Sequence, residues 1–262
     1  MERVTSADGT TIAYDRLGTG APLILVSGAT ADRRADAQLA AALAETYTVY
    51  NYDRRGRGDS TDTLPFAVER EIEDISALLD AAAHDGGGAA AVVGLSSGAA
   101  LAGRAAAVLP LRGLVMWEPP FMTDDAGLAR AREYTTNLNA RLEAGDLDGA
   151  LTTFLRYVGL PEEAIDGSRQ ESFWEAGVRV APTLAYDNAA MGGDSVVPAD
   201  VFGRITAPTL VLAGGVSPDF LPAAARAVAH AVPDARMNIL EGQTHNVDPS
   251  AFAEAVRGFL GA

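Results

Sequence analysis

The octapeptide Ala91-Val92-Val93-Gly94-Leu95-Ser96-Ser97-Gly98 joins an apolar, β-type run to a helical stretch rich in small residues. It contains the pattern Gly-x-Ser-x-Gly, which holds a serine hydroxyl outward from a sharp turn between a strand and a helix. Such a turn is strained and crowded, so a side chain at Gly94 or Gly98 would collide with nearby backbone. The pattern therefore makes Ser96 a candidate nucleophile.

Strands and helices are predicted to alternate on both sides of this turn. Residues with strand character occupy 4–6, 11–17, 22–26, 46–52, 89–93, 113–117, 208–213 and 236–240. Helical spacing of apolar residues occupies 35–45, 66–83, 99–108, 221–231 and 249–260. This alternation predicts an α/β fold with a mostly parallel sheet covered by helices on both faces.

The stretch 121–201 interrupts the alternation. Its apolar spacing is helical over 126–144, 147–158, 161–165 and 172–186, and no strand pattern separates these segments. We expect it to form a helical cap inserted after the sixth strand. The core domain would then consist of residues 1–120 and 202–262.

Composition excludes several classes of protein. The net charge of the 262-residue chain is −15, and all 20 basic residues are arginine. An acidic surface repels nucleic acid and anionic lipid, and no apolar run is long enough to cross a membrane. The absence of cysteine excludes disulfides and thiolate metal sites. The start Met1-Glu2-Arg3-Val4 lacks the pattern of a secretory signal, so we expect a cytoplasmic protein.

A serine nucleophile requires a base, and the chain offers three histidines. His84 is predicted at the end of a helix, before a glycine run, and His230 within a helix. His245 follows the last predicted strand, in the kind of loop where parallel sheets carry functional groups. His245 is therefore the candidate base.

Two acids could orient the imidazole. Glu118 directly follows the strand 113–117 and precedes Pro119-Pro120, whereas Asp219 follows the strand 208–213. Both give the chain order serine, acid, histidine. We favour Glu118 and keep Asp219 as the alternative. A structural reading competes for each residue, a salt bridge to the cap for Glu118 and a cap of the next helix for Asp219.

The surroundings of the serine suggest how a substrate would be held. The backbone amides of Ser97 and Ala29 are expected to form an oxyanion hole, since one follows the nucleophile and the other follows the strand 22–26. Aromatic residues of the cap, among them Phe121, Tyr157 and Trp174, could line an apolar pocket above Ser96. No spacing of acidic or histidine residues suggests a metal site, and no cofactor is expected.

Together these residues resemble the α/β-hydrolase superfamily over nearly the whole chain outside the cap. The segments that carry the resemblance are 26–29, 52–60, 94–98, 208–214 and 242–245. The resemblance implies an eight-stranded, mostly parallel sheet, a helical lid between the sixth and seventh strands, and the elbow serine as nucleophile. It also implies a structural role for the arginine-glycine loop within 52–60.

The chain departs from the pattern of that superfamily at two places. Ser27-Gly28 stands where many members have His-Gly, so Ser27 is a candidate substrate contact. Ser217-Pro218 stands where many have Asp-Pro, so the usual acid is missing from its usual place. Glu118 matches members similar to haloalkane dehalogenases, whose acid follows the sixth strand. Those members use an aspartate nucleophile, so a serine at 96 argues against dehalogenase chemistry.

The sequence thus predicts a metal-free serine hydrolase. Its substrate would be a carboxylic ester, lactone or thioester that is small to medium in size and largely apolar. We expect its activity to be lost at acid pH. The alternative keeps the fold and the pocket but not hydrolysis, as in a ligand receptor, a cyclase or a lyase. The sequence gives neither the substrate nor the oligomeric state.

Overall fold

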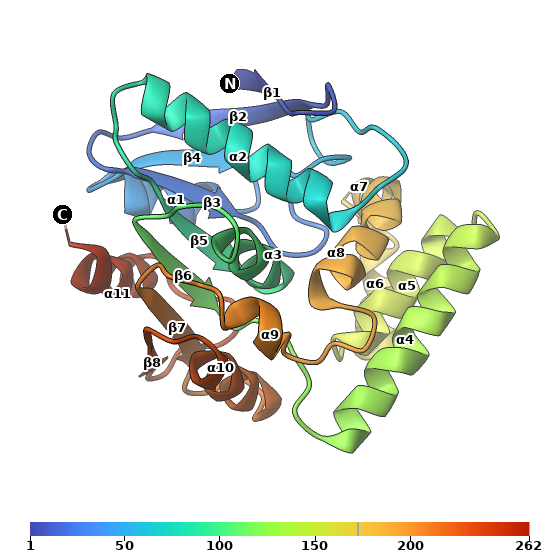
Figure 1. Cartoon of the computed structure of the whole chain (residues 1–262). Helices are drawn as coiled ribbons and strands as arrows, with labels where there is room; N and C mark the ends of the chain where they lie inside the picture. The colour runs from blue at the N-terminus through green and yellow to red at the C-terminus, as the bar shows by residue number, and fades with distance from the viewer. Residues whose placement is uncertain (172, 262) are drawn as a thin grey trace.

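A computed structural model describes residues 1–171 and 173–261 and places eight strands in one sheet (Figure 1). Their bounds are Glu2–Thr5 (β1), Thr11–Leu17 (β2), Pro22–Val26 (β3), Thr48–Tyr52 (β4), Ala91–Leu95 (β5), Gly113–Trp117 (β6), Thr209–Gly214 (β7) and Ala235–Leu240 (β8). In space the strands follow the order β1-β2-β4-β3-β5-β6-β7-β8. Each predicted strand is present, and the mostly parallel α/β architecture is confirmed.

The parallel part of the sheet brings several strand ends to one edge. Strands β4, β3, β5, β6, β7 and β8 run parallel, and β2 is antiparallel to both of its neighbours. In the register, Val26 pairs with Gly94, and Leu95 pairs with Trp117. The loops that leave β3, β5 and β6 therefore start side by side, which is where such sheets carry their functional groups.

Helices cover both faces of the sheet because the side chains of each strand alternate between them. On one face, Leu23 and Leu25 of β3 share a buried cluster with helices α1 (Ala37–Ala44) and α11 (Pro249–Leu260). On the other face, Ile24 and Val26 share a cluster with α2 (Val68–His84), α3 (Ser97–Ala106) and α10 (Phe220–Ala231). The central strands β3, β4, β5, β6 and β7 are buried along their whole length.

The described residues between β6 and β7 form helices and no strand. They are α4 (Asp125–Glu143), α5 (Leu147–Tyr157), α6 (Glu162–Ser168), α7 (Trp174–Val180), the 3₁₀ turn Ala181–Thr183, α8 (Leu184–Met191) and α9 (Ala199–Phe202). We call residues 121–201 the helical insertion. In Figure 1 its helices α4 to α7 stand to the right of the sheet. Their own buried cluster includes Tyr134, Leu138, Leu151 and Trp174.

One predicted element of the insertion is wrong. The sequence predicts a single helix over 172–186, whereas the described chain has α7 and α8 with a 3₁₀ turn between them. Pro182 lies in that turn, and a proline removes a backbone donor that a continuous helix needs. The predicted first residue, Ser172, lies outside the described residues.

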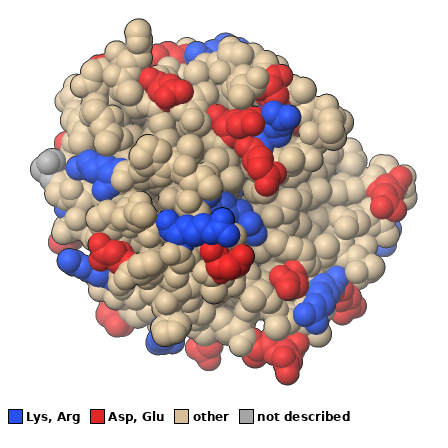
Figure 2. Space-filling view, viewed as in Figure 1, with Lys and Arg blue, Asp and Glu red and all other residues tan. Residues whose placement is uncertain are grey.

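The surface carries charges of both signs. On the face shown in Figure 2, acidic and basic side chains are scattered among uncharged ones. Within residues 1–171 and 173–261, the helices are all too short or too polar to span a bilayer.

Candidate active site

Ser96 occupies the sharp turn between β5 and α3. Its φ and ψ are 54° and −124°, a backbone conformation that residues other than glycine rarely adopt. A Cβ atom at Gly94 would lie 2.5 Å from the carbonyl oxygen of Gly98, and one at Gly98 would lie 2.4 Å from two backbone oxygens at the end of β3. The crowding predicted for both glycines is therefore present. The Ser96 side chain in this strained turn is half-buried.

Glu118 and His245 meet beside this turn. Glu118 follows β6 and is fully buried, and its Oε2 lies 2.6 Å from Nδ1 of His245. The other carboxylate oxygen, Oε1, accepts a hydrogen bond of 2.8 Å from the amide of Gly214 at the end of β7. The indole Nε1 of Trp117 donates to the backbone carbonyl of His245 at 2.9 Å. The imidazole is thus fixed by its ring nitrogen and by its own main chain, while 42% of its side chain stays exposed.

The alternative acid, Asp219, lies elsewhere. It precedes α10 at the cap position, is exposed, and makes no hydrogen bond to His245 within the described part of the chain. Its side chain does not cap the helix through a hydrogen bond either. The carboxylate that contacts the imidazole is therefore that of Glu118.

Two backbone amides next to Ser96 have no acceptor. Gly28 lies against the serine, since a Cβ atom there would be 3.2 Å from the Cβ of Ser96. The amide of the next residue, Ala29, and the amide of Ser97 at the start of α3 bond to no protein atom of residues 1–171 and 173–261. The Ser97 amide lies at the start of α3, where the helix dipole favours negative charge, whereas the Ala29 amide lies in the loop after β3.

No hydrogen bond joins the Ser96 hydroxyl to His245, although both residues are described. Catalytic hydrogen bonds are often long in unliganded enzymes and shorten when substrate is bound.

Residues 23–256 match a protein family described as the alpha/beta hydrolase family. The chain belongs to the α/β-hydrolase family. It is similar to an alpha/beta hydrolase from Sphaerobacter thermophilus DSM 20745, which is 44% identical with a TM-score of 0.87, covering 98% of this chain and 99% of that one. It is also similar to a hydrolase from Pseudomonas aeruginosa PA01, which is 26% identical with a TM-score of 0.76, covering 100% of this chain and 98% of that one.

Part of a much longer protein is similar as well. Polyketide synthase ThaQ from Burkholderia thailandensis is 28% identical over 254 residues, which cover 94% of this chain. The chain spans only 12% of the length of that relative.

Two residues expected to touch substrate are buried in this structure. Ser27 is fully buried beneath the start of α3, because Gly98 packs directly on its carbonyl group. Phe121 is fully buried against Phe202, edge to face, with ring centroids 5.8 Å apart. The role of Ser27 and Phe121 as substrate contacts stays a prediction.

Trp174 and Tyr157 belong to the interior of the helical insertion. The Trp174 indole donates to Asp148 at 2.8 Å, and the guanidinium of Arg169 lies 4.7 Å from the centre of its ring system. Tyr157 stacks on Tyr134 with ring centroids 4.1 Å apart. Their role as substrate contacts stays a prediction.

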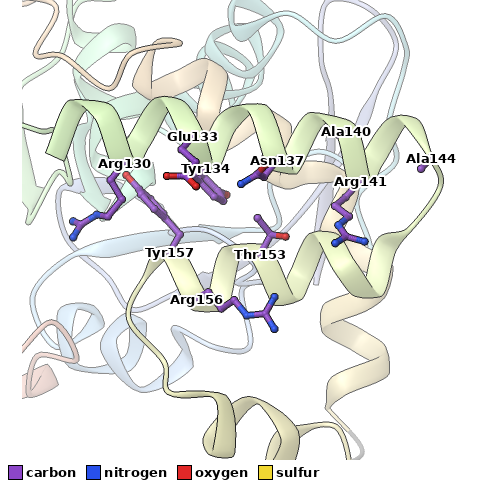
Figure 3. A pocket seen from close by; sticks show the side chains of 10 residues that line it. All are labelled: Arg130, Glu133, Tyr134, Asn137, Ala140, Arg141, Ala144, Thr153, Arg156 and Tyr157. Carbon is purple, nitrogen blue, oxygen red and sulfur yellow. The ribbon is translucent and has the colours of Figure 1, made fainter. Parts of the chain in front are cut away.

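A groove of about 670 Å³ runs along the insertion between α4 and α5 (Figure 3). Its lining includes Arg130, Glu133, Tyr134, Arg156 and Tyr157. None of its lining residues belongs to the loops that carry Ser96, Glu118 or His245. The groove is separate from the candidate active site. Within the described residues, no three histidine or acidic side chains are grouped as metal ligands.

Sequence reasoning missed one buried group next to the elbow. Asp187 of α8 accepts a hydrogen bond of 2.8 Å from the Ser97 hydroxyl and pairs with two buried arginines, Arg54 and Arg57. The arginines themselves are evident in the sequence, in the arginine-glycine loop within 52–60. Nothing in the sequence indicated which acid would neutralise them.

Proposed function

We propose that this α/β-hydrolase is a serine hydrolase that cleaves a carboxylic ester, lactone or thioester through an acyl-enzyme. Ser96 is the nucleophile, His245 the general base, and Glu118 the acid that orients the imidazole. The observation that carries the proposal is the contact of 2.6 Å between the buried Glu118 carboxylate and Nδ1 of His245, next to a strained serine turn. With Nδ1 donating to Glu118, Nε2 is the nitrogen free to accept a proton.

The chemical steps follow from these positions. His245 removes the proton from the Ser96 hydroxyl as the oxygen attacks the acyl carbon. The amides of Ala29 and Ser97 then stabilise the oxyanion, which forms only in the tetrahedral intermediate. His245 returns the proton to the leaving group, and a water molecule releases the acyl group by the same steps. Because the imidazole must be neutral to act as a base, activity falls on acidification.

We propose that the helical insertion is a cap over Ser96, with residues 1–120 and 202–262 as the core domain. The net charge of −15 favours neutral or cationic small-molecule substrates over polyanions. The similarity to a segment of a polyketide synthase makes an acyl thioester one of the substrates to test.

A fluorophosphonate probe and an activated ester test the nucleophile together. The wild-type protein should be labelled and should release p-nitrophenol from p-nitrophenyl butyrate in a burst followed by a slower steady state. Ser96→Ala should abolish both. His245→Gln should lower kcat by about 10⁴-fold or more, whereas the matched variant His230→Gln, in the last turn of α10, should retain wild-type activity.

Labelling that persists in Ser96→Ala would refute the nucleophile assignment. Absence of a burst with every ester, lactone and thioester, together with tight binding of a small ligand, would favour the non-hydrolytic use of the same site.

A further inference from the structure

A compact ionic cluster lies next to the Ser96 turn, where the helical insertion meets the core. It contains two arginines of the loop after β4, Arg54 and Arg57, with Glu71 of α2 and Asp187 of α8. All four side chains are buried, and their charges sum to zero. Arg54 is paired in a fork with Glu71 at 2.7 and 2.9 Å. Asp187 bridges Arg54 at 2.6 Å and Arg57 at 2.7 Å.

One arm of this cluster controls the peptide that carries the Ala29 amide. Nη1 of Arg57 donates to the Gly28 carbonyl at 2.6 Å, and Nη1 of Arg54 donates to the preceding Ser27 carbonyl at 3.3 Å. The peptide between Gly28 and Ala29 is trans, so its carbonyl and its N–H point in opposite directions. Because the arginine fixes the carbonyl, it also fixes the direction of the Ala29 N–H.

A second arm reaches the other amide of the proposed oxyanion hole. The hydroxyl of Ser97 donates to Oδ1 of Asp187 at 2.8 Å, while Oδ2 of the same carboxylate accepts from Arg57. Asp187 therefore bonds directly to Ser97 and is linked to the Gly28-Ala29 peptide through Arg57. It does so from α8, which belongs to the insertion and not to the sheet.

We propose that Asp187 and Arg57 are positioning residues for the oxyanion hole, so that the hole is complete only when α8 is docked against the core. This inference rests on the proposed serine hydrolase function. The cluster thereby links the position of the insertion to the stabilisation of the transition state.

The ionisation of Asp187 fits this role. Burial alone would raise the pKa of its carboxyl, but the charges of Arg57 and Arg54 outweigh burial and hold the pKa below its usual range. The carboxylate is therefore ionised at the pH of any esterase assay and accepts bonds with both oxygens.

The test compares Asp187→Asn with a variant that loosens the same docking contact elsewhere. The matched control is Tyr186→Phe, which removes the bond of 2.6 Å between Tyr186 of α8 and Asp62 of the core but leaves both amide segments untouched. The measurements are kcat and KM on p-nitrophenyl butyrate, and the inhibition constant of an alkyl trifluoromethyl ketone. That inhibitor adds to the serine and places an oxyanion in the hole.

Loss of a whole oxyanion donor costs about 10²- to 10³-fold in kcat. Because Asp187→Asn misorients the donors without removing them, kcat should fall by about ten- to a hundredfold. The ketone should bind more weakly by a similar factor, and KM should change less than about threefold. A change that only loosens the fold would not weaken the ketone in parallel with kcat. Tyr186→Phe should change all three quantities less than about threefold.

Arg57→Lys is the second variant, in case Asp187→Asn does not fold. It keeps the charge beside Asp187, but an ammonium group cannot hold Gly28, Asp187 and the neighbouring Thr183 hydroxyl at once as the guanidinium does. It should show the same parallel losses.

A folded Asp187→Asn or Arg57→Lys protein with unchanged ketone affinity would overturn the proposal. Failure of both variants to fold would also overturn it, because the cluster would then be purely structural. An inactive wild-type protein that fluorophosphonate does not label would overturn the proposed function itself. The wild-type arm thus separates the two failures.

Discussion

Replacing Glu118 by glutamine removes one negative charge from the candidate site and keeps the size of the side chain. The carboxylate is fully buried and accepts two hydrogen bonds, one from the Gly214 amide and one from Nδ1 of His245. The glutamine oxygen can replace only one of these acceptors. If it keeps the Gly214 amide, its NH₂ group faces the imidazole, and two donors then oppose each other unless the ring changes its tautomer.

The size of the effect follows from that conflict. With an NH₂ group at Nδ1, the proton of the imidazole moves to Nε2, the nitrogen that should accept the proton of Ser96. The wrong tautomer and the lost stabilisation of the imidazolium together cost about 10⁴-fold in kcat. At about 1.36 kcal/mol per factor of ten, this is roughly 5 kcal/mol of transition-state stabilisation.

Steady-state hydrolysis of p-nitrophenyl butyrate measures kcat, and urea unfolding checks that the variant is folded. The matched control is Asp219→Asn, which removes a carboxylate that is exposed, unbonded to His245 and also downstream of a parallel strand. We expect Asp219→Asn to retain kcat within about twofold. A folded Glu118→Gln protein with kcat within tenfold of the wild type would refute the assignment, and a large loss in Asp219→Asn would transfer the role to that acid.

Three further predictions concern the structure around the site. Gly98→Ala should abolish activity and lower the free energy of unfolding by about 3 kcal/mol or more, because the new methyl would lie 2.4 Å from two backbone oxygens. The control is Gly258→Ala, which adds a methyl to a helix where there is open space. In the same urea titration it should be neutral or stabilising by roughly 0.5–1 kcal/mol. Trp117→Phe keeps one aromatic ring but loses the fused ring that carries the donor to the histidine loop. Because the side chain is buried, the lost bond and the cavity together should cost about 2 kcal/mol of stability or more. We expect kcat to fall about tenfold, and an unchanged kcat would show that the loop needs no such anchor. Burial, and then hydrogen bonding to carboxylates, raises the pKa of Tyr14 and Tyr50 to about 12 from about 10 in the unfolded chain. Their contribution to stability is therefore complete below pH 10 and is lost as pH rises to 12, which urea midpoints and tyrosinate absorbance should show together; a constant midpoint across that range would contradict it.

Local pattern was enough to predict the strands and most of the helices. A parallel strand buried on both faces is a continuous apolar run, and each of the runs ending at Val26, Trp117 and Gly214 is such a strand. Helix starts were less certain because several acids compete for each cap. Asp248 caps α11, with its side chain bonded to the Ala251 amide. Asp32 lies shortly before α1 but accepts from the amide of Arg34 in the loop, and Asp36 at the N-cap position of α1 makes no side-chain cap bond.

The candidate site was only partly predictable for a different reason. The nucleophile turn is a local pattern, and His245 was selected by elimination among three histidines. The choice between Glu118 and Asp219 depended on which strand end faces the histidine loop, and the register of β6, β7 and β8 decides that. Burial of Ser27 likewise depended on how closely α3 approaches β3, which only the three-dimensional packing reveals.

Backbone strain connects the serine and the acid in a way that the sequence conceals. Among the described non-glycine residues, Ser96 and Glu118 both have positive φ, at 54° and 42°, and they follow two neighbouring strands, β5 and β6. A side chain in this region costs on the order of 1 kcal/mol relative to glycine. At 118, glycine would relieve that strain but would leave the Gly214 amide and the imidazole without their acceptor. The strain is therefore offset by charge-assisted hydrogen bonds, and this offset explains how a carboxylate can occupy a turn whose backbone favours glycine.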